Sequence, residues 1–171
     1  AAIGRDGARR LASAGKRAVA RGDMHAAGNL FGRSIALLAR DDAGRVQLLP
    51  AYAEVLMELG EFANARSVLV EASQLAASGG FPRVRHAAAL VGMLVRLYSG
   101  EPGNWSSDAQ AVAESAIVAL RSQEAPDELA NAYRLIALVH QIAGRHAEAA
   151  TAIEQVISVA GKAETIGWSR E

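Results

Sequence analysis

The chain has 171 residues, with 18 basic and 18 acidic side chains and no cysteine. Because 51% of its residues are hydrophobic, it can bury a core, and its length suits one domain or one run of repeats. The lack of cysteine excludes disulfides, thiolate zinc sites, iron–sulfur clusters and a cysteine nucleophile. No apolar stretch approaches the roughly 18 residues of a membrane span, and no signal peptide is evident. A cytoplasmic location without a membrane partner is therefore expected.

The composition favours helices. Alanine, the best helix former and a poor strand residue, makes up more than a fifth of the chain, whereas aromatic residues make up 5%. The prolines lie near the edges of apolar periodic stretches, where a missing amide is tolerated. They are Pro50, Pro82, Pro102 and Pro126. These features predict an all-α protein.

Eight helices are expected in chain order, with Ser107 and Gln110 as a capping box for the sixth and Asp127 near the start of the seventh. Their ranges are 4–21, 24–39, 46–59, 62–77, 82–98, 107–122, 127–143 and 147–160. They pair into units at about 4–40, 46–78, 82–122 and 127–160, within one repeat domain spanning 1–171. Residues 163–171 are expected to start a further helix or to form a tail.

Three glycines between helical patterns reveal a period. A small residue lies seven positions before each glycine. An alanine lies five positions after it, and a large apolar residue lies nine positions after it. A glycine permits a tight turn, and small residues let two helices cross closely beside one bulky side chain. The three sets are Gly15, Gly22, Ala27 and Phe31; Ala53, Gly60, Ala65 and Leu69; and Ala137, Gly144, Ala149 and Ile153. Repeated helical hairpins follow, with two units in the longer gap between the second and third glycines.

This pattern resembles the tetratricopeptide (TPR) repeat, most closely around Gly144 and His146. It departs from that family in its longer units, in Leu11 and Leu49 where an aromatic residue is common, and in the missing closing proline. The resemblance implies an α-solenoid, a right-handed superhelix of about four antiparallel hairpins.

Segments 48–62, 94–98 and 133–140, together with the loop around Trp105, are similar to the repeat region of multidomain bacterial regulators. Those proteins combine an adenylate/guanylate cyclase domain or a winged-helix domain with a signal-transduction ATPase. Because the chain begins at Ala1 without an initiator Met, it is expected to be a fragment of such a protein.

No residue pattern for catalysis or cofactor binding is evident. No two histidines are three or four residues apart, as metal ligands on one helix face would be; they are His25, His86, His140 and His146. A phosphate-binding loop and a Gly-x-Ser-x-Gly elbow are also missing. The expectation is no enzyme, no metal and no cofactor in this chain, and any cyclase or ATPase activity would lie elsewhere in the full-length protein.

The balanced charge hides an asymmetry, because residues 1–40 carry a net charge of +6 and residues 41–171 carry −6. The basic first helix is either a docking face for an acidic partner, nucleic acid or another domain of the same protein, or a solvated face at the end of the array. No aromatic residues lie between its arginines to stack bases, which argues against nucleic acid.

Stacked hairpins of this kind form a concave groove lined by the first helix of each pair. Transferring the TPR groove positions, as the resemblance implies, selects Arg9, Lys16, Gln47, Glu54, Met57, Glu58, His86, Met93, Arg96, Asn131, Arg134 and Gln141. The arginines could clamp a carboxylate or pair with glutamates across the groove. The methionines are either adaptable contacts or edges of the core.

The predicted function is a non-catalytic protein-interaction domain of a bacterial signalling or transcriptional regulator. It would bind a peptide or protein segment, from a separate partner or from its own protein. A small-molecule inducer sensor is one alternative and would need a closed cavity. A self-association module is another, and would need an exposed apolar patch near Trp168.

Overall fold

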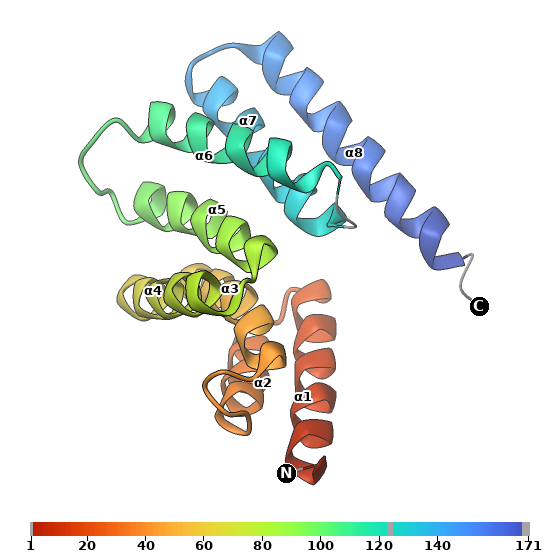
Figure 1. Cartoon of the computed structure of the whole chain (residues 1–171). Coiled ribbons are helices and arrows are strands. Elements are labelled where there is room, and N and C mark those ends of the chain that lie inside the picture. The colour runs from red at the N-terminus through yellow and green to blue at the C-terminus, as the bar shows by residue number, and fades with distance from the viewer. Residues whose placement is uncertain (1, 123–124, 169–171) are drawn as a thin grey trace. The chain divides into compact units, whose positions relative to one another are not determined.

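The computed structural model describes residues 2–122 and 125–168, with side chains described for 4–122 and 125–160. The described residues form helices and connecting turns without strands, which confirms the all-α prediction (Figure 1). The helices are α1 (Ala2–Ala20), α2 (Met24–Ala36), α3 (Ala43–Glu58), α4 (Phe62–Gly79), α5 (Pro82–Tyr98), α6 (Trp105–Leu120), α7 (Pro126–Ile142) and α8 (His146–Trp168).

The predicted helix ends lie within three residues of the observed ends, except at the C-terminal end of α8. That helix runs on to Trp168, so residues 163–168 continue it rather than start another, and 169–171 lie outside the described residues. The predicted capping box is wrong. Helix α6 begins at Trp105 and has Asn104 at its N-cap position, which places Ser107 inside the first turn. The buried Trp105 side chain, 9% exposed, accounts for the earlier start.

The same glycine turn occurs in the described chain at Gly22, Gly60, Gly100 and Gly144, and also at Gly80 (φ 69°) between α4 and α5, where the Phe81 N–H donates to the Ala76 carbonyl oxygen at 3.0 Å. Gly22, Gly60 and Gly144 have φ angles of 71–76°, as their predicted role requires, and Gly100 in the longer gap has φ 69°. After each glycine the next residue donates its backbone N–H to the carbonyl five residues earlier, the bond of a Schellman motif. These bonds run from Asp23 to Ala18 (2.9 Å), Glu61 to Leu56 (2.8 Å), Glu101 to Arg96 (3.1 Å) and Arg145 to His140 (2.9 Å).

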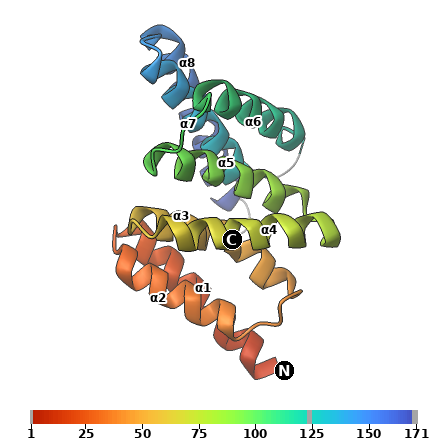
Figure 2. The same ribbon diagram turned by 90° about the vertical axis from the view of Figure 1, so that its left-hand side faces the viewer.

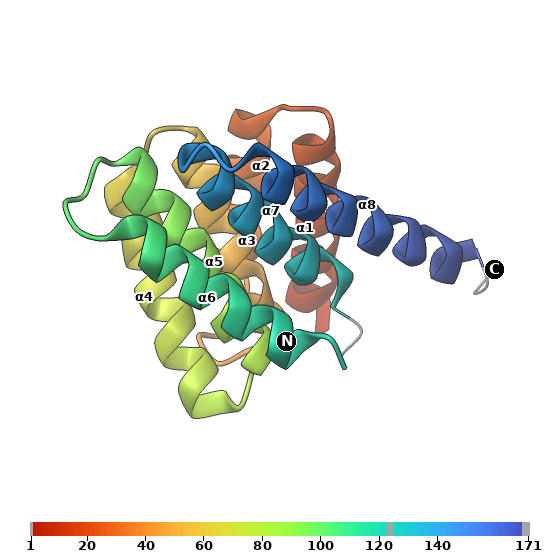
Figure 3. The same ribbon diagram turned by 90° about the horizontal axis from the view of Figure 1, so that it is seen from above.

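The chain divides into two compact units, unit 1 (Ala1–Val95) and unit 2 (Arg96–Glu171). In unit 1, α1 packs on α2, α2 on α3 and α3 on α4, and α1 also contacts α3 (Figure 2). One apolar core, which includes Phe31, Leu49 and Val91, runs through this unit from α1 into α5. In unit 2, α7 packs on both α6 and α8 (Figure 3).

Helices α1 and α2 cross closely at Gly15. A Cβ atom added there would lie 2.4 Å from Cε1 of Phe31, whose ring is 1% exposed. Beside this crossing the buried Ser34 hydroxyl donates a 2.8 Å hydrogen bond to the Ala8 carbonyl oxygen. At the end of the same pair, Arg5 Nε lies 2.9 Å from Asp42 Oδ2, while Oδ1 of Asp42 caps α3 by accepting from the Gly44 N–H at 2.9 Å. The Phe31 ring and the Ser34–Ala8 hydrogen bond therefore hold the α1–α2 crossing, and the Arg5–Asp42 ion pair links the start of α1 to the start of α3.

We expect Gly15→Ala to lower the free energy of unfolding by up to about 2 kcal/mol. Overpacking costs roughly 1–3 kcal/mol, offset by about 1 kcal/mol of helix propensity. The matched control is Gly92→Ala in α5, where an added Cβ meets nothing within 4 Å; this change should stabilise by about 0.4–1 kcal/mol. Urea unfolding measures both variants, and a stabilised Gly15→Ala variant would contradict the close crossing.

Candidate functional site

The predicted groove residues are distributed over both units. Unit 1 holds Arg9, Lys16, Gln47, Glu54, Met57, Glu58, His86 and Met93, and unit 2 holds Arg96, Asn131, Arg134 and Gln141. In unit 1 the first helices of consecutive hairpins, α1 and α3, are in contact. The parts of the predicted groove in these two helices therefore lie on neighbouring elements.

On α1, Arg9 and Lys16 are both exposed. The Arg9 guanidinium lies 3.9 Å from Asp6 one turn earlier, and this exposed ion pair neutralises its charge only weakly. On α3, Gln47 is exposed and Glu54 is half-buried. The surface of these two helices thus offers cations on one helix and polar acceptors on the next.

Met57 differs from the other predicted groove residues because it is only 5% exposed and belongs to the core of unit 1. A buried side chain has almost no surface to offer a ligand, so the structure favours the core alternative for Met57. Met93 and His86, both on α5, are half-buried. They retain some accessible surface.

In unit 2 the two predicted arginine clamps already have neighbours. Arg96 Nη1 lies 3.0 Å from Asp108 Oδ2, and its Nε lies 3.7 Å from Glu101 Oε2. Arg134 is exposed and donates to Asn131 Oδ1 at 3.1 Å. An incoming carboxylate at Arg96 would compete with two anionic side chains, whereas the partner of Arg134 among the described side chains is the neutral Asn131.

His86 is a titratable group of the predicted groove whose environment changes its acidity. Partial burial disfavours the charged imidazolium, and the neighbouring Arg85 charge acts in the same direction, so the pKa of His86 lies below its usual value of about 6.5. The neutral imidazole is therefore the favoured form of His86 near pH 7.

This shift predicts a pH dependence of stability. Because the folded pKa of His86 is lowered, the unfolded chain binds the proton more readily, and stability falls as the pH drops from above 6.5 through the folded pKa. We expect His86→Gln to lose less stability than the wild type between pH 7.5 and pH 5. Urea unfolding at both values measures this, with His25→Gln on α2 as the control. Equal losses in the wild type and His86→Gln would contradict the assignment.

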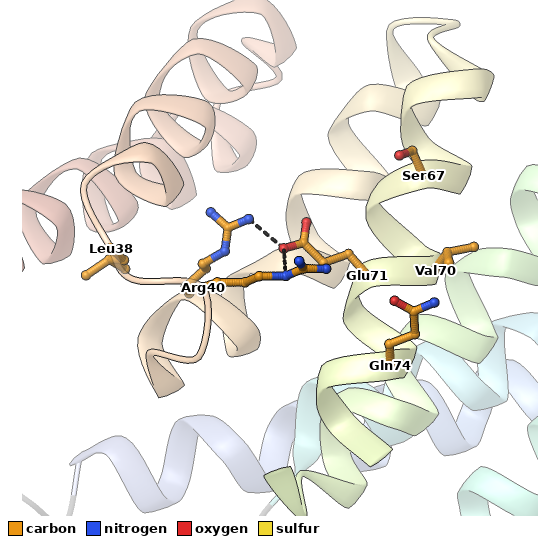
Figure 4. Close-up of a pocket in the computed structure, with 7 residues that line it drawn as sticks. Leu38, Arg40, Ser67, Val70, Glu71 and Gln74 are labelled. Carbon is orange, nitrogen blue, oxygen red and sulfur yellow. Dashed lines mark hydrogen bonds and ion pairs between the residues drawn. The ribbon is translucent and has the colours of Figure 1, made fainter. Parts of the chain in front are cut away.

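A hollow that sequence reasoning missed lies beside α4 in unit 1 (Figure 4). Its volume is about 530 Å³. Its lining comes from one face of α4, at positions i, i+3, i+4 and i+7, from the α2–α3 connection, and from the first turn of α3. The residues are Leu38, Arg40, Arg45, Ser67, Val70, Glu71 and Gln74. We call this site the α4 hollow.

Two arginines converge on one carboxylate in the α4 hollow. Arg45 Nη2 lies 2.6 Å from Glu71 Oε1, and its Nη1 donates to the Ile35 carbonyl oxygen at 3.0 Å. With a side chain only 17% exposed, Arg45 ties the end of α2 and the start of α3 to α4. Arg40, by contrast, has a side chain 73% exposed and its Nε is 3.8 Å from the same oxygen. Arg45 is thus a structural link, and Arg40 is a loosely held cation.

Among the described side chains, no group of three or more His, Asp or Glu residues is placed to hold a metal ion. None of the described helices is both long and apolar enough to cross a membrane. No family model matches the sequence, and no curated protein is significantly similar to it.

Proposed function

We propose that this chain is a TPR-like α-solenoid that binds a protein or peptide segment along its first helices, as a non-catalytic interaction domain of a bacterial, cytoplasmic signalling or transcriptional regulator. The recurrence of one glycine turn at Gly22, Gly60, Gly100 and Gly144 supports a repeat array. Spacings of 38, 40 and 44 residues exceed the 34 of the TPR consensus. The right-handed superhelix belongs to this proposal.

The observation that carries the proposal is the contact between α1 and α3 within unit 1. In a stack of hairpins, neighbouring first helices form an extended surface that suits a polypeptide better than a compact small molecule. Here that surface carries the exposed cations Arg9 and Lys16 and the polar groups of Gln47 and Glu54. A segment with acidic side chains would meet α1 with complementary charge.

We expect peptides selected from a displayed library against the chain to be acidic and to bind less tightly as salt rises. Lys16→Glu should weaken binding at least about tenfold, equivalent to roughly 1.4 kcal/mol. Arg33→Glu on α2 makes the same charge change at another exposed site and should stay within about twofold of the wild type. Isothermal titration calorimetry measures all three proteins. Equal weakening by both changes would show that peptide affinity follows the net charge of the chain, and it would contradict a binding site on α1.

Self-association through α8 is a second candidate because one repeat position is buried in unit 1 and exposed in unit 2. Phe31 and Leu69 are 1% and 7% exposed, whereas the corresponding Ile153 is 44% exposed and Ile157, one turn later, is 67% exposed. The adjoining end of α7 also exposes Ile142 (55%). The apolar patch expected near Trp168 thus has a counterpart earlier in α8, while the Trp168 side chain lies outside those described.

For this second candidate, light-scattering chromatography should give the mass of a dimer for the wild type and of a monomer for Ile157→Glu. Introducing a charge into an apolar interface leaves it desolvated and unpaired. The control is Val118→Glu on α6, which changes a side chain that is 79% exposed and should preserve the dimer. A wild-type monomer at about 100 μM, well above the Kd expected of a specific dimer, would eliminate self-association.

A further inference from the structure

We propose that the α4 hollow is a binding site for a small carboxylic acid with an apolar body, which the Arg40 guanidinium holds by its carboxylate. The site lies on the second helix of a hairpin, in the α2–α3 connection and at Arg45 in the first turn of α3, and it shares no residue with the proposed polypeptide groove. It is therefore independent of that function, and either site can fail without the other.

Charge is the first argument for an anionic ligand. The lining of the hollow contains two guanidinium groups and one carboxylate, so it carries one uncompensated positive charge. Arg45 is fixed by its 2.6 Å contact with Glu71 and by its bond to the Ile35 carbonyl oxygen. Because Arg45 already satisfies Glu71, the excess charge resides on Arg40.

Arg40 is free to exchange partners. Its ion pair with Glu71 is long, at 3.8 Å, and its side chain is 73% exposed, so breaking this contact costs little. A guanidinium presents parallel N–H groups that match the two oxygens of a carboxylate. An incoming carboxylate can therefore replace a weak ion pair with a bidentate one.

Ser67 and Gln74 add polar contacts beside the arginine. They lie two turns apart on the same face of α4, and their side chains have no hydrogen-bond partner within the described part of the chain. A hydroxyl and a carboxamide can each donate or accept. They suit the second polar group of a small acid, such as an amide or a hydroxyl.

The apolar part of the ligand is specified by Val70, which lies between these two residues on α4. Val70 is 56% exposed, and Leu38 lines the same hollow from the α2–α3 connection. The hollow is an open depression, and its volume of about 530 Å³ gives room for a small ligand that stays partly exposed to solvent. A branched aliphatic body of leucine size therefore fits the space and its chemistry.

The test uses N-acetyl-leucine as the probe and N-acetyl-leucinamide, which lacks only the charge, as its matched control. In ¹⁵N-edited NMR spectra of the whole chain, N-acetyl-leucine should shift the Arg40 Nε–H signal and the backbone amides of residues 67–74. The amide control should leave them in place, and inorganic phosphate should bind at least tenfold more weakly because it lacks the apolar body.

Two substitutions complete the test. Arg40→Gln should weaken binding of N-acetyl-leucine at least tenfold, while Arg33→Gln, which removes an exposed arginine of α2, should leave it unchanged. Glu71→Gln removes the carboxylate that pairs with both guanidinium groups, so it should tighten binding severalfold. If this variant does not fold, the comparison of Arg40→Gln with Arg33→Gln still decides the proposal. Equal effects of the two arginine changes, equal binding of the amide, or no shift near α4 would overturn the proposal. Shifts confined to α1 and α3 would also overturn it and would support the first-helix surface instead.

Discussion

The architecture of unit 1 depends on how closely α1 approaches α2. Gly15 has no side chain at the crossing, and the Phe31 ring occupies the space that a Cβ would need. Ala18 and Ala27, both fully buried, keep the two helices equally close on either side of the turn at Gly22. Because small residues let the helices approach, the hairpin is held by close van der Waals contact around one large side chain, Phe31.

This way of packing determines which surfaces remain for function. Nearly all buried positions are taken by apolar residues, almost half of them alanine, and the long polar side chains of Arg9 and Lys16 on α1 and Gln47 on α3 stay exposed. The second helix of a hairpin offers another surface. On α4 this surface lines the α4 hollow, where Arg45 contacts both Glu71 and the end of α2. Helix α8 exposes Ile153 at the repeat position where earlier hairpins bury Phe31 and Leu69. Three chemically distinct surfaces thus arise from one repeated hairpin.

The helices and turns could be predicted from the sequence because their signals are local. A glycine with a small residue before it and an alanine after it specifies a turn and a crossing within about fifteen residues, and Gly22 and Gly60 show the expected positive φ. The start of α6 was mispredicted because Ser107 supplied a local capping pattern, whereas burial of Trp105 depends on tertiary packing.

The α4 hollow was missed for a related reason. Arg45 and Glu71 are 26 residues apart, and nothing in their neighbours along the chain indicates that they form a 2.6 Å contact. Met57 shows the same limit, since its position in the helix fits both a groove and a core and only the packing places it in the core. A regular i, i+3, i+4, i+7 set on α4, polar except for Val70, was the available signal for the hollow, although solvated helix faces have the same pattern.

The account's central claim is that the first helices of the hairpins form the surface that receives a polypeptide. The most direct measurement is an NMR chemical-shift map of the ¹⁵N-labelled chain with a peptide selected for binding to it. The account predicts that the shifted amides cluster on α1 and α3, around Lys16, Gln47 and Glu54. Shifts confined to α4 or α8 would contradict the claim and would assign the binding surface to the second helices instead.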